Sequence, residues 1–318
     1  MSEISCDVIV IGAGPAGEVA AGRLADGGLE VVVVENHLVA GECSYYACMP
    51  SKPLLRPGDL IDEARRIPGV KEAVTGDIDV ASALARRDEV IHDLDDSVQL
   101  PWLEDKGIRL VRGIGKLTGE KTVTAGEHEI TASRAVVIST GTRPAMPPID
   151  GLADSSPWNN RDATTAKKAP ASMLVLGGGP VGVELAQAWA SFGTDVTLID
   201  LDPRLLAREE PFAAEQVEKS LRERFGVEVV TGAKTTKVSR EGGTVKLNLE
   251  DGREFVAEEI LAATGRKPNS DDIGLDSVGV EADPFVETDD RLRVGGRDWL
   301  YAIGDVNGRA LLTHMGKY

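Results

Sequence analysis

The sequence has few of the features that mark nucleic-acid-binding, membrane-spanning or disulfide-stabilised proteins. Its 318 residues include 35 Lys and Arg against 52 Asp and Glu, a formal charge of −17, so it has little basic surface for nucleic acid or an anionic membrane. No apolar run approaches the roughly 18 residues that are needed to span a bilayer. The three cysteines, two of them close together, suit catalysis in a reducing compartment better than a structural disulfide. We therefore expect a cytoplasmic protein without a nucleic-acid or membrane partner.

Aromatic residues are also scarce, whereas glycine is abundant. The chain has 4% aromatic residues and 35 glycines, a balance that favours an α/β protein with tight phosphate-binding loops over an all-β protein. The length suggests about two domains, enough to bury substantial cores.

Two of the cysteines, Cys43 and Cys48, lie just ahead of a predicted helix start. Pro50 suits the first turn of a helix, so Cys48 is expected near the positive end of the helix dipole, where a thiolate is favoured. Two residues five apart in a regular helix have Cα atoms roughly 8–9 Å apart, which is beyond the reach of a disulfide. If these cysteines bond, the backbone between them must be distorted or only partly helical. The pair alone fits a redox centre, zinc ligands or buried apolar residues, but no second Cys or His pair supports zinc, and no metal site is predicted.

A glycine-rich loop follows the first predicted strand, residues 7–11, and precedes a helical pattern. A second strand over residues 30–34 ends in Glu35. This order is typical of a dinucleotide-binding fold, in which glycines let the backbone approach a pyrophosphate and the acid accepts hydrogen bonds from a ribose. The loop residues that are predicted to bind this nucleotide are Gly12, Gly14, Pro15, Ala16 and Gly17.

The second half of the chain repeats this pattern. A strand over residues 195–199 ends in Asp200, which lies eighteen residues beyond Gly182, just as Glu35 lies eighteen residues beyond Gly17. An acid here accepts the 2′-hydroxyl of NAD and repels the 2′-phosphate of NADP, so NAD is predicted, with NADP less favoured. Arg204 and Arg208 lie close enough to compensate for the acid. The loop residues that are predicted to bind this second nucleotide are Gly177, Gly179, Pro180, Val181 and Gly182.

The remaining segments complete the two repeats. Two helices are predicted between residues 54 and 103, and antiparallel meanders over residues 107–130 and 226–260. Each meander leads into a strand. The sequence therefore predicts an α/β fold with two Rossmann-like three-layer nucleotide-binding domains, each with an inserted antiparallel meander.

The joint order of these motifs resembles the pyridine nucleotide-disulfide oxidoreductases, which include dihydrolipoamide dehydrogenase, glutathione and mycothione reductases and mercuric reductase. The shared motifs are the two glycine loops, C-x-x-x-x-C-x-P-S-K after the first, T-G-R-x-P-N after the second, and a late strand ending in Gly-Asp. The resemblance spans nearly the whole chain. It implies an FAD domain over residues 1–148, an NAD(P) domain over 149–268, and a return segment, 269–318, that completes the FAD domain.

The resemblance also implies roles for individual residues. Glu35 would bind the adenosine ribose of FAD, and Asp305 would bind the ribityl chain. The N–H groups near Thr313 and His314 would face the flavin pyrimidine oxygen. The other implied cofactor contacts are Gly41, Glu42, Thr140, Gly141, Gly265, Arg266, Gly304 and Leu312.

Four residues are implied to carry the chemistry. Lys52 would lie beside the flavin and pair with Glu184; Cys48 would be the flavin-proximal cysteine, and Cys43 the thiol that attacks a disulfide substrate. The implied activity is an NAD(P)H-dependent flavoprotein disulfide reductase of the EC 1.8.1 type, acting on a dihydrolipoamide-type or low-molecular-weight-thiol disulfide. The alternatives are a mercuric-reductase-like metal ion reductase and a flavin- and nucleotide-binding fragment without turnover.

The sequence departs from the family pattern in three places. Tyr45 and Tyr46 stand among residues that are usually Asn and Gly, and either shape the substrate approach or pack. Glu42 replaces a threonine, and its carboxylate should raise the pKa of the Cys43 thiol. Family members continue into a C-terminal dimerisation domain with a His-Glu pair, and none of the four histidines here lies in a matching segment. We interpret the chain, which ends at Tyr318, as a truncated or naturally short form, and we expect a homodimer only of a full-length member.

Overall fold

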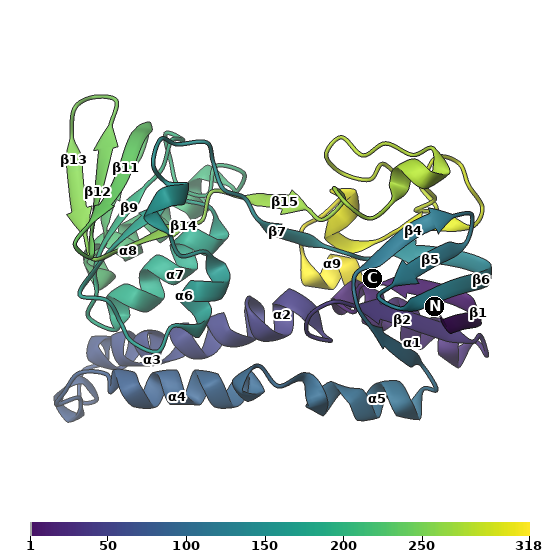
Figure 1. The fold of residues 1–318 in the computed structure, drawn as a ribbon. Helices are drawn as coiled ribbons and strands as arrows, with labels where there is room; N and C mark the ends of the chain where they lie inside the picture. The colour runs from purple at the N-terminus through teal and green to yellow at the C-terminus, as the bar shows by residue number, and fades with distance from the viewer. Residues whose placement is uncertain (1) are drawn as a thin grey trace. The chain divides into compact units, whose positions relative to one another are not determined.

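The computed structural model describes residues 2–318, which form two compact units. Unit 1 comprises the residues up to 45, residues 94–143 and residues 266–318. Unit 2 comprises residues 46–93 and 144–265. Each unit is therefore assembled from separate stretches of the chain, as the mixed colours within each unit show (Figure 1).

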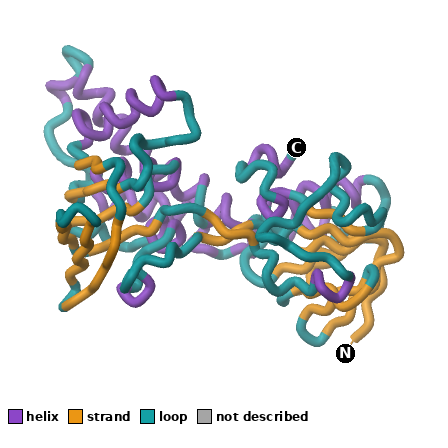
Figure 2. The backbone as a smooth tube through the Cα atoms, turned by 90° about the horizontal axis from the view of Figure 1, so that it is seen from above, coloured by secondary structure: helices purple, strands orange, loops and turns teal. Residues whose placement is uncertain are grey.

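Unit 1 is built on a seven-stranded sheet with the order β3-β2-β1-β6-β5-β4, in which β16 also pairs with β6. Figure 2 shows the strands of this unit lying side by side in orange, with the N-terminus where β1 begins. The strands of the parallel part are β1 (Ser2–Ile11), β2 (Val31–Glu35), β3 (Arg109–Arg112), β6 (His128–Ile138) and β16 (Leu300–Ala302). The antiparallel part consists of β4 (Gly115–Gly119), β5 (Thr122–Ala125) and the first residues of β6.

Strand β6 serves both parts of this sheet. Its first residues pair with β5 in antiparallel fashion, while its whole length pairs in parallel with β1. The sequence predicted a meander over residues 107–130 and a separate strand over 135–139, whereas the structure has one continuous strand. The parallel pairing extends to Ser2, so β1 is longer than predicted, with a register shift between Cys6 and Val8.

The strands at the centre of unit 1 are buried on both faces, as is typical of parallel sheets. Ile9 and Ile11 belong to one apolar cluster, whereas Val8 and Val10 belong to another on the opposite face. The helices of unit 1 are α1 (Pro15–Asp26), α2 (Gly41–Tyr45), α5 (Leu100–Asp105) and α9 (Thr313–Lys317). Short 3₁₀ turns include η3 (Asp96–Gln99), η5 (Leu275–Val278) and η6 (Gly304–Asn307).

Unit 2 contains a parallel sheet of four strands in the order β10-β9-β8-β14 and an antiparallel sheet in the order β11-β12-β13. The parallel strands are β8 (Ser172–Leu176), β9 (Asp195–Ile199), β10 (Glu228–Val230) and β14 (Glu259–Ala262). The antiparallel strands are β11 (Thr235–Glu241), β12 (Thr244–Leu249) and β13 (Glu254–Ala257). The two parallel sheets and their antiparallel meanders confirm the predicted fold class.

The helices of unit 2 are α3 (Cys48–Arg66), α4 (Val80–Val90), α6 (Asn160–Thr165), α7 (Pro180–Ser191) and α8 (Pro211–Phe225). Helices α3 and α4 run side by side and account for the two helices that the sequence predicted there (Figure 1). Helix α3 also packs on α7, where a Cβ at Gly58 would lie only 2.5 Å from the Ser191 Cβ. Residues 46–93 therefore pack within unit 2, although they follow the first nucleotide repeat in the sequence.

A two-stranded sheet, β7 (Thr142–Pro144) with β15 (Arg266–Pro268), marks where the chain leaves unit 1 and later returns to it. Strand β16 then pairs with β6, so the chain after β15 adds a strand to the sheet of unit 1. Among residues 2–318, no helix combines the length and apolarity that a membrane span requires.

Candidate active site

The first glycine loop joins β1 to α1 and packs closely against the end of β6. Gly12 has a φ of +104°, and a Cβ at this position would collide with the Ser139 carbonyl group. A Cβ at Gly17 would collide with the Gly12 carbonyl oxygen. Both positions therefore require glycine. At Gly14, in contrast, a Cβ would meet no atom within 4 Å, and no side chain caps α1, so the N-terminus of this helix has room for a phosphate group.

The segment that carries Cys43 lies against this loop. The Ala40 N–H donates to the Ala13 carbonyl oxygen at 2.8 Å, and a Cβ at Gly41 would lie 2.8 Å from the Gly14 Cα. Ala40 has a φ of +77°, a conformation that a non-glycine residue keeps only where its surroundings impose it. Helix α2 is therefore held in a defined position beside the glycine loop.

Other predicted segments of unit 1 reach the same region. A Cβ at Gly12 would lie 3.2 Å from the Thr140 nitrogen, and a Cβ at Gly304 would lie 3.0 Å from the Ala16 Cβ. A Cβ at Gly316, in α9, would lie 3.4 Å from that same Ala16 atom. The structure thus brings the ends of β6 and β16 and the short helix α9 to the first turn of α1. Within α9, Leu312 is the N-cap and Thr313 and His314 begin the helix.

Glu35 ends β2 and faces the first loop. Its Oε2 accepts the Ala13 N–H and its Oε1 accepts the His37 N–H, both at 2.7 Å. Because each carboxylate oxygen can accept a second hydrogen bond, Glu35 retains acceptors for ribose hydroxyls. Glu18 lies in the first turn of α1, and burial raises its pKa to about 7, although Lys317 acts to lower it.

The two neighbouring cysteines lie in different helices. Cys43 belongs to α2, whereas Cys48 is the first residue of α3, at the positive end of a 19-residue helix dipole, as expected. Ala47, between them, has φ −130° and ψ −103°, so the backbone departs from a regular helix, as a disulfide between them would require. Cys6 is buried in β1, and burial raises its pKa to about 11, which excludes it as a reactive thiol.

The two tyrosines between these cysteines are buried. Tyr45 is 1% exposed and Tyr46 is 7% exposed. The Tyr46 carbonyl oxygen accepts Asn160 Nδ2 at 3.0 Å and Thr164 Oγ1 at 3.2 Å, and the Arg161 guanidinium lies 4.8 Å from the ring centre. Of the two roles that the sequence left open, the structure supports packing.

Lys52 and Glu184 form the ion pair that the resemblance implied. Lys52 Nζ lies 2.8 Å from Glu184 Oε1 and 2.9 Å from Oε2, and Ser51 Oγ donates to Oε2 at 3.1 Å. The pair links α3 to α7 about one turn after Cys48. Because the side chains are 60% and 40% exposed, the pair contributes little to stability, and its main effect is to hold the Lys52 ammonium group in place.

The second glycine loop, between β8 and α7, repeats the geometry of the first. Gly177 has a φ of +111°, and a Cβ there would lie 2.5 Å from the Ala263 carbonyl oxygen. A Cβ at Gly182 would collide with the Gly177 carbonyl oxygen, whereas a Cβ at Gly179 would meet nothing within 4 Å. Like α1, α7 begins with a proline, Pro180, and has no side-chain cap. The loop therefore has room for a second pyrophosphate at a helix N-terminus.

Asp200 follows β9 and accepts hydrogen bonds from the Gly178 and Asp202 N–H groups. Arg204, one of the two arginines near it, donates to the carbonyl oxygens of residues 206, 207 and 209 at 2.7–2.9 Å. Its guanidinium therefore stabilises the loop after Asp200, whereas Arg208 is exposed.

A chain of four polar side chains in unit 1 links the residue beside Cys43 to Asp305. Arg266 Nη2 lies 3.3 Å from Glu42 Oε2 and donates to the Thr142 carbonyl oxygen at 2.7 Å, while Nε donates to Thr142 Oγ1 at 2.6 Å. Thr142 Oγ1 in turn donates to Asp305 Oδ2 at 2.9 Å. Burial raises the pKa of the Asp305 carboxyl, the Thr142 hydrogen bond and Arg266 lower it, and Glu42 raises it.

Three of these site residues were not predicted from the sequence. Thr142 directly follows Thr140-Gly141 and Ser51 directly precedes Lys52, so the neighbouring motifs could have indicated both. Glu18 had no such signal, because its raised pKa arises from burial in the folded unit.

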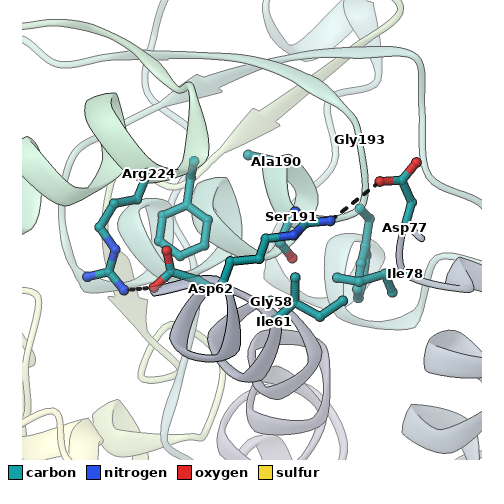
Figure 3. A pocket seen from close by; sticks show the side chains of 12 residues that line it. Gly58, Ile61, Asp62, Asp77, Ile78, Ala190, Ser191, Gly193 and Arg224 are labelled. Atoms are coloured by element: carbon teal, nitrogen blue, oxygen red, sulfur yellow. Dashed lines mark hydrogen bonds and ion pairs between the residues drawn. The ribbon is translucent and has the colours of Figure 1, made fainter. Parts of the chain in front are cut away.

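A separate cavity of about 410 Å³ lies in unit 2 between α3, α7 and α8 (Figure 3). Its four charged side chains pair with one another, Arg224 with Asp62 and Arg65 with Asp77, the latter at 3.7 Å. The twelve residues that line it include none of the predicted site residues, so we assign it no part in the site. Within residues 2–318, no three His, Cys, Asp or Glu side chains are grouped as a metal site would require.

The chain matches known proteins over nearly its whole length. The profile of the pyridine nucleotide-disulphide oxidoreductase family matches residues 6–317. The mercuric reductase of Staphylococcus aureus is 32% identical over 319 residues, which cover 98% of this chain and 58% of that protein. The dihydrolipoyl dehydrogenase of Chlorobaculum tepidum is 34% identical over 322 residues, which cover 97% of this chain and 67% of that protein.

A solved structure supports the same fold. The HOCl-induced flavoprotein disulfide reductase RclA from Escherichia coli has a TM-score of 0.85 and 25% identity, covering 98% of this chain and 68% of that one. The chain spans between 50% and 59% of the length of three curated mercuric reductases that it matches. By its profile match and these relatives, the chain belongs to the pyridine nucleotide-disulphide oxidoreductase family, a family of flavoprotein disulfide reductases that bind FAD and NAD(P)H.

Proposed function

We propose that the protein passes electrons from NADH through FAD to a Cys43–Cys48 disulfide and then to a small disulfide substrate. The observation that carries this proposal is the convergence, in unit 1, of the first glycine loop and the Cys43 helix. Gly41 packs on Gly14, so the cysteine segment lies next to the loop that has room for a pyrophosphate. A nucleotide-binding protein without redox chemistry would not need a pair of cysteines beside this glycine loop.

The residues of unit 1 fit FAD. The open N-terminus of α1 beside Gly14 would bind the pyrophosphate, Glu35 the adenosine ribose and Asp305 the ribityl chain. The other cofactor contacts that the sequence implied in this unit stay part of the proposal. When bound, FAD supplies a carrier that takes up electrons from a reduced nicotinamide and delivers them to a disulfide.

The cysteines divide the thiol chemistry. Cys48 lies at the N-terminus of α3, where the helix dipole stabilises a thiolate, so it is the cysteine that we assign to the cofactor side. Cys43 is then the thiol that attacks the substrate disulfide, displacing one substrate thiolate and forming a mixed disulfide; Cys48 attacks Cys43 and releases the second thiolate. Lys52, held by Glu184, provides a positive charge one turn beyond Cys48.

The nicotinamide cofactor is proposed to be NAD. Asp200 presents a carboxylate at the end of β9, where a 2′-phosphate would be repelled. Arg204 donates to three carbonyl oxygens of the loop that follows, and these hydrogen bonds hold its guanidinium on that loop rather than beside the site of a 2′-phosphate. We place the protein in the cytoplasm, where a reactive cysteine pair is kept available by a reducing environment.

Steady-state NADH oxidation with lipoamide or a low-molecular-weight disulfide as acceptor tests this proposal. We expect turnover by the wild-type protein, its loss in Cys48→Ser with FAD still bound, and its retention in Cys6→Ser, which changes a buried thiol. Turnover that survives in Cys48→Ser would overturn the cysteine assignment. Binding of FAD and NADH without turnover by the wild-type protein would favour a nucleotide-binding fragment.

A second candidate, reduction of a metal ion, is favoured by the relatives that are mercuric reductases. It predicts NADH oxidation that depends on Hg(II) and not on an organic disulfide. The same assay, with Hg(II) in place of the disulfide, separates the two candidates.

A further inference from the structure

The link between Glu42 and Asp305 has a fixed hydrogen-bond direction. A threonine hydroxyl has one hydrogen. Arg266 Nε donates to Thr142 Oγ1, so the hydroxyl hydrogen is free to point at Asp305 Oδ2, 2.9 Å away. Thr142 is only 3% exposed, so water competes little for these groups. This hydrogen bond orients the Asp305 carboxylate through Oδ2, and Oδ1 can accept from a ligand.

The charges along this link alternate. Glu42 and Asp305 are acidic and Arg266 lies between them, and the Glu42 and Arg266 side chains are each 23% exposed. Such partial burial strengthens an ion pair relative to one in open solvent. Arg266 donates to Thr142 from Nε and Nη2 and to Glu42 from Nη2, so removing Glu42 takes away a carboxylate that helps to hold the guanidinium beside Thr142.

We propose that Glu42, in addition to the cofactor contact that the resemblance implies, is a positioning residue for FAD binding: it holds Arg266 so that Thr142 orients the Asp305 carboxylate toward the cofactor. This inference rests on the proposed function, in which Asp305 contacts FAD. It gives a role to the acidic residue that stands where the family usually has threonine. It also joins the helix that carries Cys43 to the cofactor-binding carboxylate through one guanidinium group.

The first test is the affinity for FAD, measured by quenching of FAD fluorescence as protein is added. We expect the dissociation constant to rise tenfold or more in Glu42→Ala and in Thr142→Val, and to stay within threefold of wild type in Glu42→Asp. The double variant Glu42→Ala/Thr142→Val should bind FAD no more weakly than Thr142→Val alone, because both changes interrupt the same chain of contacts. Glu127→Gln, at an exposed turn of unit 1, controls for the loss of one negative charge.

The second test is the pH dependence of FAD binding, which a purely structural role would not move. Asp305 faces Thr142, Arg266 and Glu42. The affinity of the protein for FAD should fall as the Asp305 carboxyl is protonated. Thr142→Val removes a donor to the carboxylate, so the midpoint of this loss should move to higher pH. Glu42→Gln keeps the shape but removes a repelling charge, so the midpoint should move to lower pH.

The outcomes separate this inference from the proposed function. Wild-type affinity and an unchanged pH midpoint in Glu42→Gln and Glu42→Ala, in a protein that binds FAD and reduces disulfides, would overturn the inference alone. Failure of the wild-type protein to bind FAD would overturn both. Should Glu42→Ala not fold, the FAD affinities of Glu42→Gln, Thr142→Val and their double variant still decide the question.

Discussion

Glu18 should make the stability of unit 1 depend on pH. This carboxyl has an ordinary pKa of 4.5 and is raised to about 7 by burial in the first turn of α1. Between pH 4.5 and about pH 7, the folded protein therefore keeps a proton on Glu18 that the unfolded chain releases. The stability that Glu18 contributes is fully present below pH 4.5 and is lost as the pH rises through 7.

The size of the effect follows from the shift. Each pKa unit corresponds to about 1.4 kcal/mol, so the ionised Glu18 should reduce the free energy of unfolding by up to about 3 kcal/mol at pH 8. Glu18→Gln removes the charge and should be more stable than wild type at pH 8 by up to this amount. The difference should disappear near pH 4.5.

Urea unfolding at several pH values between 5 and 8, followed by circular dichroism, measures this difference. Glu127→Gln is the matched control, because it removes one exposed negative charge from the same unit. The reasoning would be refuted by parallel stability profiles for wild type and Glu18→Gln. It would also be refuted if Glu127→Gln gained as much stability at pH 8 as Glu18→Gln.

Three further predictions concern single residues. Gly58→Ala should lower the free energy of unfolding by about 1–3 kcal/mol, because its Cβ would lie 2.5 Å from Ser191 Cβ; adding Ser191→Gly should restore most of the loss, as urea unfolding would show. Cys6 should resist labelling by a thiol reagent in the folded, reduced protein and react only on unfolding, since it is buried with a pKa of about 11; fast labelling of three thiols would contradict this. Asp200→Asn should raise kcat/KM for NADPH relative to NADH by roughly tenfold, and an unchanged ratio would argue against the NAD assignment.

The glycine loops could be predicted from the sequence because their reasons are local. Gly12 and Gly177 adopt positive φ, and Gly17 and Gly182 meet a carbonyl oxygen of their own loop. These constraints act over a few residues, so the motif, its flanking strand and the acid at the next strand end identify them. The same holds for Cys48, whose place at a helix start follows from the proline two residues later.

The features that sequence reasoning missed depend on contacts between distant segments. Residues 46–93 pack in unit 2 because α3 contacts α7. The presence of Gly58 in the sequence does not by itself indicate this contact. Strand β6 is continuous because β1 pairs along its whole length. The link from Glu42 to Asp305 joins residues that are far apart in the chain, and burial of Tyr45 decides its role only once the fold is formed.

The most direct test of the central claim is an anaerobic titration of the purified protein with NADH, followed by its visible spectrum in wild type and Cys48→Ser. The account predicts a yellow FAD protein whose reduction by NADH produces a long-wavelength absorbance band in wild type, and no such band in Cys48→Ser. Simple bleaching of the flavin spectrum, identical in the two proteins, would contradict the proposal that the Cys43–Cys48 pair accepts electrons from the flavin.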